Sequence, residues 1–549
     1  MARAILDRLL AENERYKKGE GACPRVLVYV DPDIDGVVAA RVIMSWLDEH
    51  GVPYKWYCNT GRAHGFFLTD DELCDYLGDA ENSIAGGYII HGDFTIEFDK
   101  LKDLVSKGLF VLSTDHHEVP YRGDKGPVIY AKGGTKEAGR WGEPVEVQER
   151  VFNDSTGLSG ITGLGVIINN QYDFEPEYRR YQSGTGVIVD VLRGYSGSDW
   201  GGEPLNQLVG WTLLSDVRDI SGAEAKWWLS RLFSWNYGSA ISLAPGSLSG
   251  VLKHVVDEVM RNRTDWNFGV VKMTRTFVDY TLSPAINALF RFDLENDAVR
   301  LMLGGEYPKY RGRYGRNWQE YQRAVRDEIL AEATVTRYGE GFVVLDISWP
   351  YKSFILSGCR VSNFIGLAAS QLMDAEDSCV LAISRGVGGE VERASFRGKY
   401  NLPYREELAR AGVLQGAGHS AAFGVPGMGK EVDFKGVGRV VNRLLDEYKA
   451  SNGVDKLYIV VDNLGPVGSS GAAEKLAEYN EYAPSPQKVY LKYTGSGIDV
   501  LKASAKRVVF SVDGVEVLYF GKEASDDVVK GGFLAVSKGR NGVEYTLER

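Results

Sequence analysis

An apolar run, RVLVYV at residues 25–30, is followed directly by the acidic turn DPDIDG and then by a segment of helical apolar spacing that ends at Gly51. A short run that is apolar at nearly every position is typical of a strand buried on both faces. The same pattern recurs at residues 87–94 and 109–117, where each apolar run ends in carboxylate and imidazole side chains. These units predict an α/β fold with a parallel sheet.

The acidic turns predict a metal site. The carboxyl ends of parallel strands meet at one edge of a sheet, so the polar side chains that follow them converge. Three predicted strands end in this way, and the run at residues 211–214, which leads into an acidic segment, is a candidate for a fourth. The carboxylates expected at this edge are Asp31, Asp33, Asp35, Asp93, Asp115 and Asp216. Like charges this close raise one another's pKa, so the set implies divalent cations.

Carboxylate and imidazole ligands together suit Mn²⁺, Mg²⁺ or Fe²⁺, and this number of ligands favours a pair of ions. For a single Asp after a strand, a helix N-cap or a solvated loop is the commoner role. The combination of several such segments favours metal binding instead. The five cysteines are scattered without a CxxC pair, so they suggest neither a zinc site nor a disulfide framework.

In chain order, DPDIDG, HGD, DHH and SDVRD resemble the four acidic motifs of the DHH superfamily of phosphoesterases. The metal ligands that this resemblance implies are Asp33, Asp35, Asp93, His116 and Asp216. Asp93 is then the ligand that bridges two ions, Mn²⁺ or Mg²⁺. Asp31 occupies a further position that is His or Asp in relatives, and we include it as a ligand.

Two more residues of the DHH segment are the candidate catalytic pair. By the resemblance, His117 contacts the substrate phosphate, and Asp115 orients an imidazole. His64 and His91 have no counterpart in the motifs. For His91 we predict a structural role with its hydrogen bonds satisfied.

Beyond these motifs the chain is similar to the RecJ type of single-strand DNA exonuclease. The similar segments are SGTGVIVDVL at 183–192, SPAINALFR at 283–291, NFIGLAAS at 363–370 and GAGHSAAFG at 416–424. The substrate-phosphate contacts that they imply are Asn287, Arg291, Arg397, Gly416, Gly418 and His419. Leu289 and Phe290 depart from the small residues of the family's motif, and Gly398 replaces a Ser.

The segment KYRGRYGRNWQEYQRAVR at residues 309–326 interleaves basic and aromatic residues. Basic side chains follow a phosphate backbone, and aromatic rings stack on unpaired bases. The candidate single-strand DNA tract comprises Arg311, Arg313, Tyr314, Arg316 and Trp318. A solvated helix face with its aromatic residues packed inward is the alternative.

A chain of 549 residues is too long for one compact core. The predicted parts are a DHH catalytic domain (1–235), a helical linker containing SPAINALFR (236–334), a second α/β, DHH-associated substrate-binding domain (335–430) and a β-rich C-terminal domain (431–549). RecJ proteins carry an oligonucleotide-binding barrel at the place of the last part, so an OB-like fold is a candidate there.

The formal net charge of −11 argues against a protein that coats nucleic acid, although it allows a local basic groove. No apolar run reaches the roughly 18 residues that span a bilayer, so we expect a cytoplasmic protein without a membrane partner.

The resemblance implies a two-metal exonuclease that degrades single-stranded DNA from 5′ to 3′ into mononucleotides. It also implies a monomer, with a single-strand-binding protein or a helicase as candidate partners. Two alternatives stay open: a phosphodiesterase for short oligonucleotides or cyclic dinucleotides, and an inactive DHH scaffold.

Overall fold

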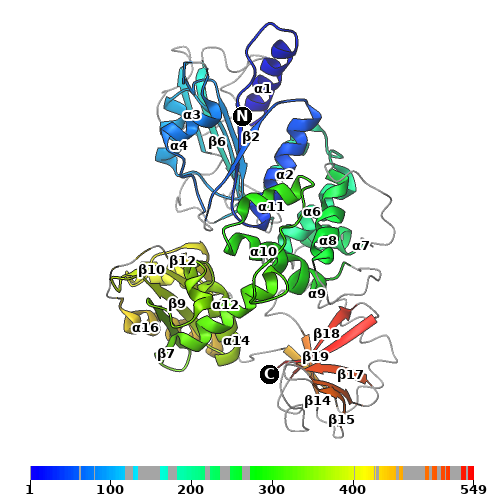
Figure 1. The fold of residues 1–549 in the computed structure, drawn as a ribbon, viewed down its shortest axis with the longest axis vertical. Coiled ribbons are helices and arrows are strands. Elements are labelled where there is room, and N and C mark those ends of the chain that lie inside the picture. The colour runs from blue at the N-terminus through cyan, green and yellow to red at the C-terminus, as the bar shows by residue number, and fades with distance from the viewer. Residues whose placement is uncertain are drawn as a thin grey trace.

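The computed structural model describes residues 2–60, 64–79, 81–117, 128–133, 161–170, 182–216, 223–234, 248–262, 273–400, 402–425, 427, 429, 432–452, 457–461, 489–493, 498–503, 508–512, 515–519, 533–539 and 542–548. Within them, three sheets follow one another along the chain, and a group of helices lies between the first sheet and the other two (Figure 1).

The first sheet has six strands in the order β2-β1-β3-β4-β6-β5. Five run parallel, and β5 pairs antiparallel with β6. In register, Tyr29 lies beside His91 and Gly92 beside Thr114, so β1, β3 and β4 end at the same edge. The predicted parallel α/β sheet is confirmed. The strands are β1 Val26–Val30, β2 Lys55–Cys58, β3 Tyr88–Gly92, β4 Phe110–Asp115, β5 Val128–Gly133 and β6 Ile161–Asn169.

Helices cover both faces of this sheet. Alternate residues of β1 enter two separate cores, with Val28 on the side of α1, α2 and α5 and Leu27 on the side of α3 and α4. This two-sided burial explains why the strand is apolar at every position. The helices are α1 Ala2–Lys17, α2 Ile34–Glu49, α3 Asp70–Leu77, α4 Phe98–Ser106 and α5 Gly184–Ser196.

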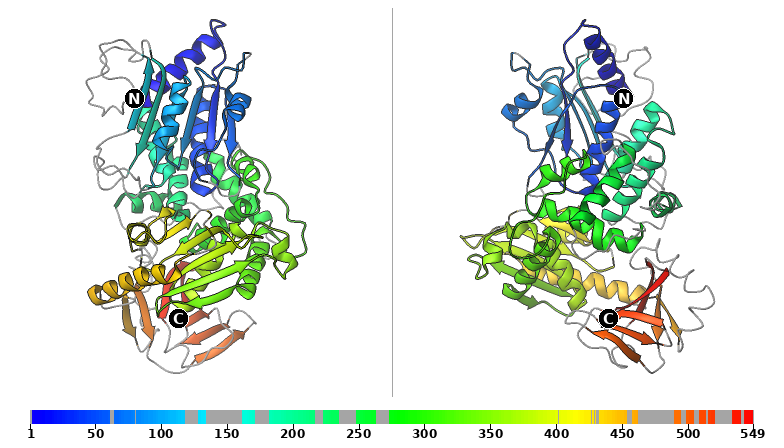
Figure 2. Two further views of the ribbon diagram at one scale, coloured as in Figure 1. Left: turned by 90° about the vertical axis from the view of Figure 1, so that its left-hand side faces the viewer. Right: turned by 45° about the vertical axis from the view of Figure 1, so that its right-hand side comes forward.

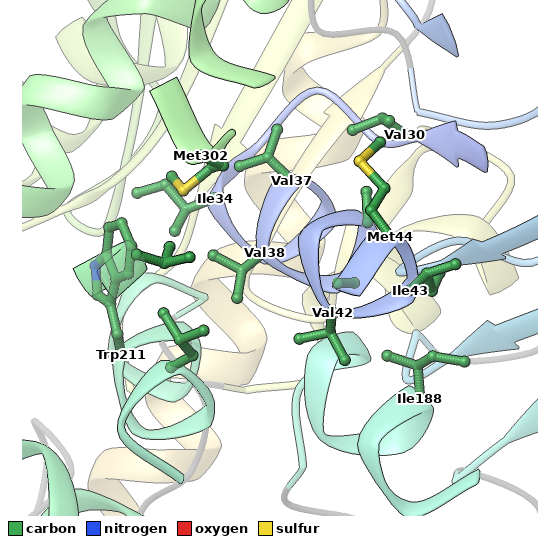
Figure 3. Packing of buried hydrophobic residues seen from close by; sticks show 14 of the residues in the cluster. Val30, Ile34, Val37, Val38, Val42, Ile43, Met44, Ile188, Trp211 and Met302 are labelled. Atoms are coloured by element: carbon green, nitrogen blue, oxygen red, sulfur yellow. The ribbon is translucent and has the colours of Figure 1, made fainter. Parts of the chain in front are cut away.

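A helical segment follows, and α2 is the element that joins it to the sheet. Figure 3 shows the apolar residues of α2 packed among Ile188 of α5, Trp211 of α6 and Met302 of α11. The segment comprises α6 Gly202–Ser215, α7 Ala223–Ser234, α8 Leu248–Arg261, α9 Arg275–Phe277, η3 Val278–Leu282, α10 Ser283–Arg291, α11 Glu295–Met302 and α12 Trp318–Glu332.

One element differs from the prediction. The run at residues 211–214 is not a strand but the end of α6, and Asp216 caps the carboxyl end of that helix. The helix is buried on most of its surface, because Leu205, Leu208 and Trp211 all lie in the core. A short apolar run in such a helix has the same appearance as a buried strand.

The second sheet has the order β11-β12-β10-β9-β8-β7, with only β8 and β9 parallel. Helices α12 and α14 pack on one face, and α15 and α16 pack on the other. The strands are β7 Thr334–Arg337, β8 Phe342–Ser348, β9 Cys379–Arg385, β10 Val391–Arg397, β11 Ala417–His419 and β12 Ala422–Val425. The helices are α13 Phe354–Ser357, η4 Val361–Asn363, α14 Ile365–Glu376, α15 Tyr404–Arg410 and α16 Phe434–Asn452.

Helix α16 begins just after the predicted boundary at residue 430, yet Val437 and Val441 pack with Phe342 of the second sheet. The second α/β unit therefore includes residues that the sequence assigned to the C-terminal part. The other domain boundaries given in the sequence analysis stay predictions.

The C-terminal strands form one mixed sheet in the order β13-β14-β18-β19-β17-β16-β15 (Figure 2). The predicted β-rich character is confirmed, and α9 contacts β18. The strands are β13 Leu457–Val461, β14 Val489–Tyr493, β15 Ile498–Ala503, β16 Val508–Val512, β17 Val515–Tyr519, β18 Phe533–Gly539 and β19 Gly542–Glu548. Among the described residues, no helix combines the length and apolar character that crossing a membrane requires.

Candidate metal centre

The turn after β1 delivers three carboxylates to the edge of the first sheet. Asp33 is the N-cap of α2 and accepts a hydrogen bond from Gly36 N at 2.9 Å. Asp33 therefore also has the helix N-cap role that is common for an Asp after a strand. Asp35, in the first turn of the helix, is buried and accepts from Gly184 N at 2.6 Å and Thr185 N at 3.0 Å. The amino end of α5 thus fixes the Asp35 carboxylate.

Asp93 follows β3 in an unusual backbone conformation. Its φ of 81° lies in the left-handed region, where few non-glycine residues are found. Gly184 approaches it closely, because a Cβ added to this glycine would lie 2.6 Å from Asp93 Oδ1 and 2.7 Å from its Cα. One carboxylate oxygen, Asp93 Oδ2, is buried without a hydrogen-bond partner among the described residues.

His116 is the point at which the carboxylates meet. Its Nε2 lies 2.9 Å from Asp93 Oδ1, 3.5 Å from Asp216 Oδ2 and 3.7 Å from Asp35 Oδ2. These groups come from β3, the end of α6, α2 and the end of β4, which are far apart in the sequence. The structure therefore brings three of the predicted carboxylate ligands to the imidazole of a fourth predicted ligand, His116.

Asp115 holds the DHH segment in place. Its carboxylate accepts from the backbone N–H groups of His116 and His117, from His117 Nδ1 at 2.8 Å and from the Thr95 hydroxyl. Asn169 Nδ2 donates to His117 O at 2.8 Å. Burial opposes ionisation of Asp115, but the imidazole of His117 and these donors lower its pKa below the ordinary value. Burial likewise opposes protonation of His117, but Asp115 raises its pKa to about 9.

The second α/β unit reaches this cluster through one hairpin. The predicted Gly-rich segment forms β11 and β12, and His419 Nε2 lies 3.1 Å from Asp216 Oδ1. The rings of His419 and His117 are stacked, with centroids 5.4 Å apart. Gly418 has a φ of 126°, which glycine adopts readily, and a Cβ at Gly416 would lie 2.5 Å from Gly424 O. These glycines shape the hairpin that carries His419.

The electrostatics of the cluster favour a cation. Burial raises the pKa of Asp93 well above its usual value, and neighbouring carboxylates raise it further. Burial and the nearby Asp216 raise the pKa of Asp35 to about 6. Burial also raises the pKa of Asp31. A divalent ion would offset this repulsion and supply a partner for the orphaned Asp93 Oδ2. The three groups of potential ligand atoms are Asp93–Asp115–His116–His117, Asp35–His116–Asp216 and Asp31–Asp33–His64.

The other predicted substrate contacts gather at a different place. Asn363 Nδ2 donates to Arg291 O at 3.2 Å, and a Cβ at Gly366 would lie 2.8 Å from Arg397 Nη2. Arg291 Nη1 donates to Asn287 O at 3.2 Å. The similar segments SPAINALFR and NFIGLAAS therefore meet Arg397 of β10 around the start of α14.

In the basic tract, the structure favours the inward-packed alternative for the aromatic rings. Tyr314 and Trp318 pack on the core that contains Tyr321, and Trp318 Nε1 donates to Pro308 O at 2.8 Å. Arg316 forms an ion pair with Glu320. Tyr314 and Trp318 are only partly buried by this packing, so their stacking on bases stays a prediction, and Arg311 and Arg313 are exposed.

His91 is structural, as predicted, but its hydrogen bonds are not satisfied. Its ring is fully buried and stacks on Phe94 with centroids 3.9 Å apart. Neither ring nitrogen has a hydrogen-bond partner among the described residues. Burial lowers the pKa of His91 to about 3, so the ring is neutral at physiological pH.

Residues 217–219 of the SDVRD segment lie outside the described residues. Sequence reasoning missed several residues that support the cluster. Thr95 and Asn169 hold Asp115, and no spacing in the sequence indicates either of them. Gly184 and Thr185 lie in the segment SGTGVIVDVL, at the start of a helix capped by Ser183, but neither the similarity nor the cap indicates that they donate to Asp35.

The first sheet carries carboxylates and a histidine pair at its carboxyl edge, and helices link it to a second α/β unit whose hairpin reaches that edge. This arrangement is a DHH-type fold of the RecJ-like kind. A crystal structure of RecJ in complex with Mn²⁺ from Thermus thermophilus is similar to the whole chain, at 16% identity and a TM-score of 0.56, with 70% of the RecJ chain covered.

Two further solved structures are similar at lower TM-scores. RecJ in complex with Mg²⁺ from Thermus thermophilus matches 100% of this chain and 68% of its own, at 13% identity and a TM-score of 0.47. Exonuclease RecJ bound to manganese matches 82% of this chain and 93% of its own, at 15% identity and a TM-score of 0.45. Comparisons with protein-family models and with curated proteins find no match.

Proposed function

We propose that this chain is a two-metal phosphodiesterase that degrades single-stranded DNA from the 5′ end to mononucleotides. One observation carries the proposal: carboxylates from three distant elements converge on His116, and His419 of the second α/β unit reaches one of them, Asp216. A substrate phosphate placed there would contact both units at once.

In this proposal the protein ligands of the ions are Asp31, Asp33, Asp35, Asp93, His116 and Asp216. When bound, two ions of Mn²⁺ or Mg²⁺ would activate water and neutralise charge on the phosphate. Asp93 is suited to hold both, because one of its oxygens faces His116 and the other is buried and unpaired among the described residues.

His117 is the residue that would assist at the phosphate. Its Nδ1 is engaged by Asp115, which favours protonation of the imidazole, and the other ring nitrogen is left for the phosphate. Asp115 is a positioning residue, since its own oxygens are used to hold the DHH segment. His419, whose ring is stacked on that of His117, would contact the same phosphate from the second α/β unit.

The choice of single-stranded DNA and of 5′ to 3′ polarity rests on the resemblance to RecJ exonucleases, and exposed Arg311 and Arg313 are suited to contact a phosphate backbone. A single-strand-binding protein or a helicase is the proposed kind of partner. The packing of Tyr314 and Trp318 weakens one argument for a long substrate. For this reason a phosphodiesterase acting on short oligonucleotides is the second candidate.

The test is Mn²⁺-dependent digestion of a single-stranded oligonucleotide labelled at either end, beside a dinucleotide and an Asp93→Ala protein. Progressive loss from the 5′ end, absent in the variant, supports the exonuclease. Cleavage of the dinucleotide alone favours the second candidate, and equal activity of the variant would overturn both.

A further inference from the structure

A histidine outside the DHH motifs lies at the edge of the cluster. His64 Nδ1 is 2.5 Å from Asp31 Oδ2, and the potential ligand atoms of His64, Asp31 and Asp33 all lie within 4.8 Å of one another. Asp31 and Asp33 are close enough to Asp93 to raise its pKa. The group therefore borders the carboxylates around His116 and is not a separate site elsewhere on the surface.

The backbone next to His64 is held by contacts that do not involve Asp31. Asn59 Nδ2 donates to Gly65 O at 2.7 Å, and Phe67 N donates to the Tyr29 hydroxyl at 3.1 Å. Tyr29 in turn donates its hydroxyl to Asn59. Because Tyr29 belongs to β1, this network ties the segment to the strand that ends at Asp31. The position of His64 is thus part of the fold.

Asp31 supplies an independent sign of a ligand. Its side chain is fully buried, and while Oδ2 faces His64, Oδ1 has no hydrogen-bond partner among the described residues. A buried carboxylate oxygen without a donor is strongly unfavourable unless a cation binds it. His64, in contrast, is 41% exposed, so an ion arriving from solvent can reach the group.

We propose that His64 is a ligand of the metal pair, and that with Asp31 and Asp33 it gives one of the two positions a preference for Mn²⁺ over Mg²⁺. The inference rests on the two-metal centre of the proposed function and extends it by one residue and by the identity of the ion. Oxygen ligands suit both ions, whereas an imidazole nitrogen favours first-row transition metals. Mg²⁺ in addition requires a nearly ideal octahedron of oxygens.

The experiment counts Mn²⁺ bound to the full chain by electron paramagnetic resonance and then measures how well Mg²⁺ displaces it. The variants are His64→Ala, which removes the ligand, and His64→Asp, which replaces nitrogen by oxygen. His254→Gln is the matched control, because His254 bonds to Gly305 O in the helical segment. Circular dichroism establishes that each variant is folded.

We expect two Mn²⁺ per wild-type and control chain, and about 10- to 100-fold weaker binding of one ion in His64→Ala. In His64→Asp both ions bind, but Mg²⁺ displaces one of them about 10-fold more readily than in wild type. Unchanged binding and displacement in both variants would overturn the role of His64 and leave the metal centre standing. Absence of bound Mn²⁺ in the wild type would instead overturn the metal centre on which the proposed function depends.

Discussion

Replacing Asp35 by Asn tests how much this buried carboxyl group lowers the stability of the metal-free protein, and whether the bound metal depends on it. The Asp35 carboxyl is fully buried, and burial together with Asp216 raises its pKa from 3.8 to about 6. The folded chain without metal therefore resists ionisation of this group. At neutral pH, a shift of this size corresponds to about 3 kcal/mol of lost stability.

The sign of the effect follows from the order in which the two states lose their protons. Below the unfolded pKa of 3.8 both states are protonated, and Asp35 has no effect. As pH rises toward 6, the unfolded chain ionises first, so stability falls, and above 6 the loss is complete. Asn cannot ionise, so Asp35→Asn removes this pH dependence. The variant also loses part of the hydrogen bonding to Gly184 and Thr185, but that loss is the same at every pH.

The assay is urea unfolding in EDTA, followed by fluorescence of the buried Trp46 and Trp211, at about pH 4 and pH 7. Relative to wild type, Asp35→Asn should gain about 2.4 kcal/mol between the two pH values, because the unfolded carboxyl is already partly ionised at pH 4. Asp75→Asn, an exposed carboxylate on α3, is the control and should gain nothing. Added Mn²⁺ at about 100 times its dissociation constant should stabilise wild type by about 2.7 kcal/mol and the variant by much less. Equal pH dependence in the two proteins would refute the reasoning.

Three other predictions concern the surroundings of the cluster. Gly184→Ala places a methyl group 2.6 Å from Asp93 Oδ1, so Mn²⁺ binding should weaken at least about 10-fold in a titration. The control is Gly194→Ala on the same helix, whose added methyl group has nothing within 4 Å and which should bind Mn²⁺ as wild type does. His91→Leu should make stability less sensitive to acid. Because the pKa of His91 is about 3 in the folded chain, the free energy of unfolding of wild type falls by about 1.4 kcal/mol per pH unit below pH 6.5, and denaturation curves between pH 4 and 7 measure the difference. His419→Asn should raise KM about 10-fold with the Mn²⁺ count unchanged, and a lower count would show that His419 holds the ion instead.

Much of the fold follows from local patterns. The segments at 25–30, 87–94 and 109–117 predicted buried parallel strands because each contains a short apolar run that leads into polar side chains or an acidic turn. The strand register then brings Asp31, Asp93 and Asp115 to one edge. The failure at residues 211–214 has a physical cause, since a helix buried on most sides loses the periodic pattern that distinguishes it from a strand.

The sequence by itself determined the order of α/β units, the residue types at the strand ends and hence the need for a cation among the carboxylates. Tertiary structure alone decided which groups support them: α5 donates to Asp35, Asn169 holds the DHH segment, and Tyr29 and Asn59 position His64 over Asp31. It also decided that Tyr314 and Trp318 pack inward. These outcomes depend on contacts between segments far apart in the chain, and such contacts leave no spacing in the sequence from which they could be predicted.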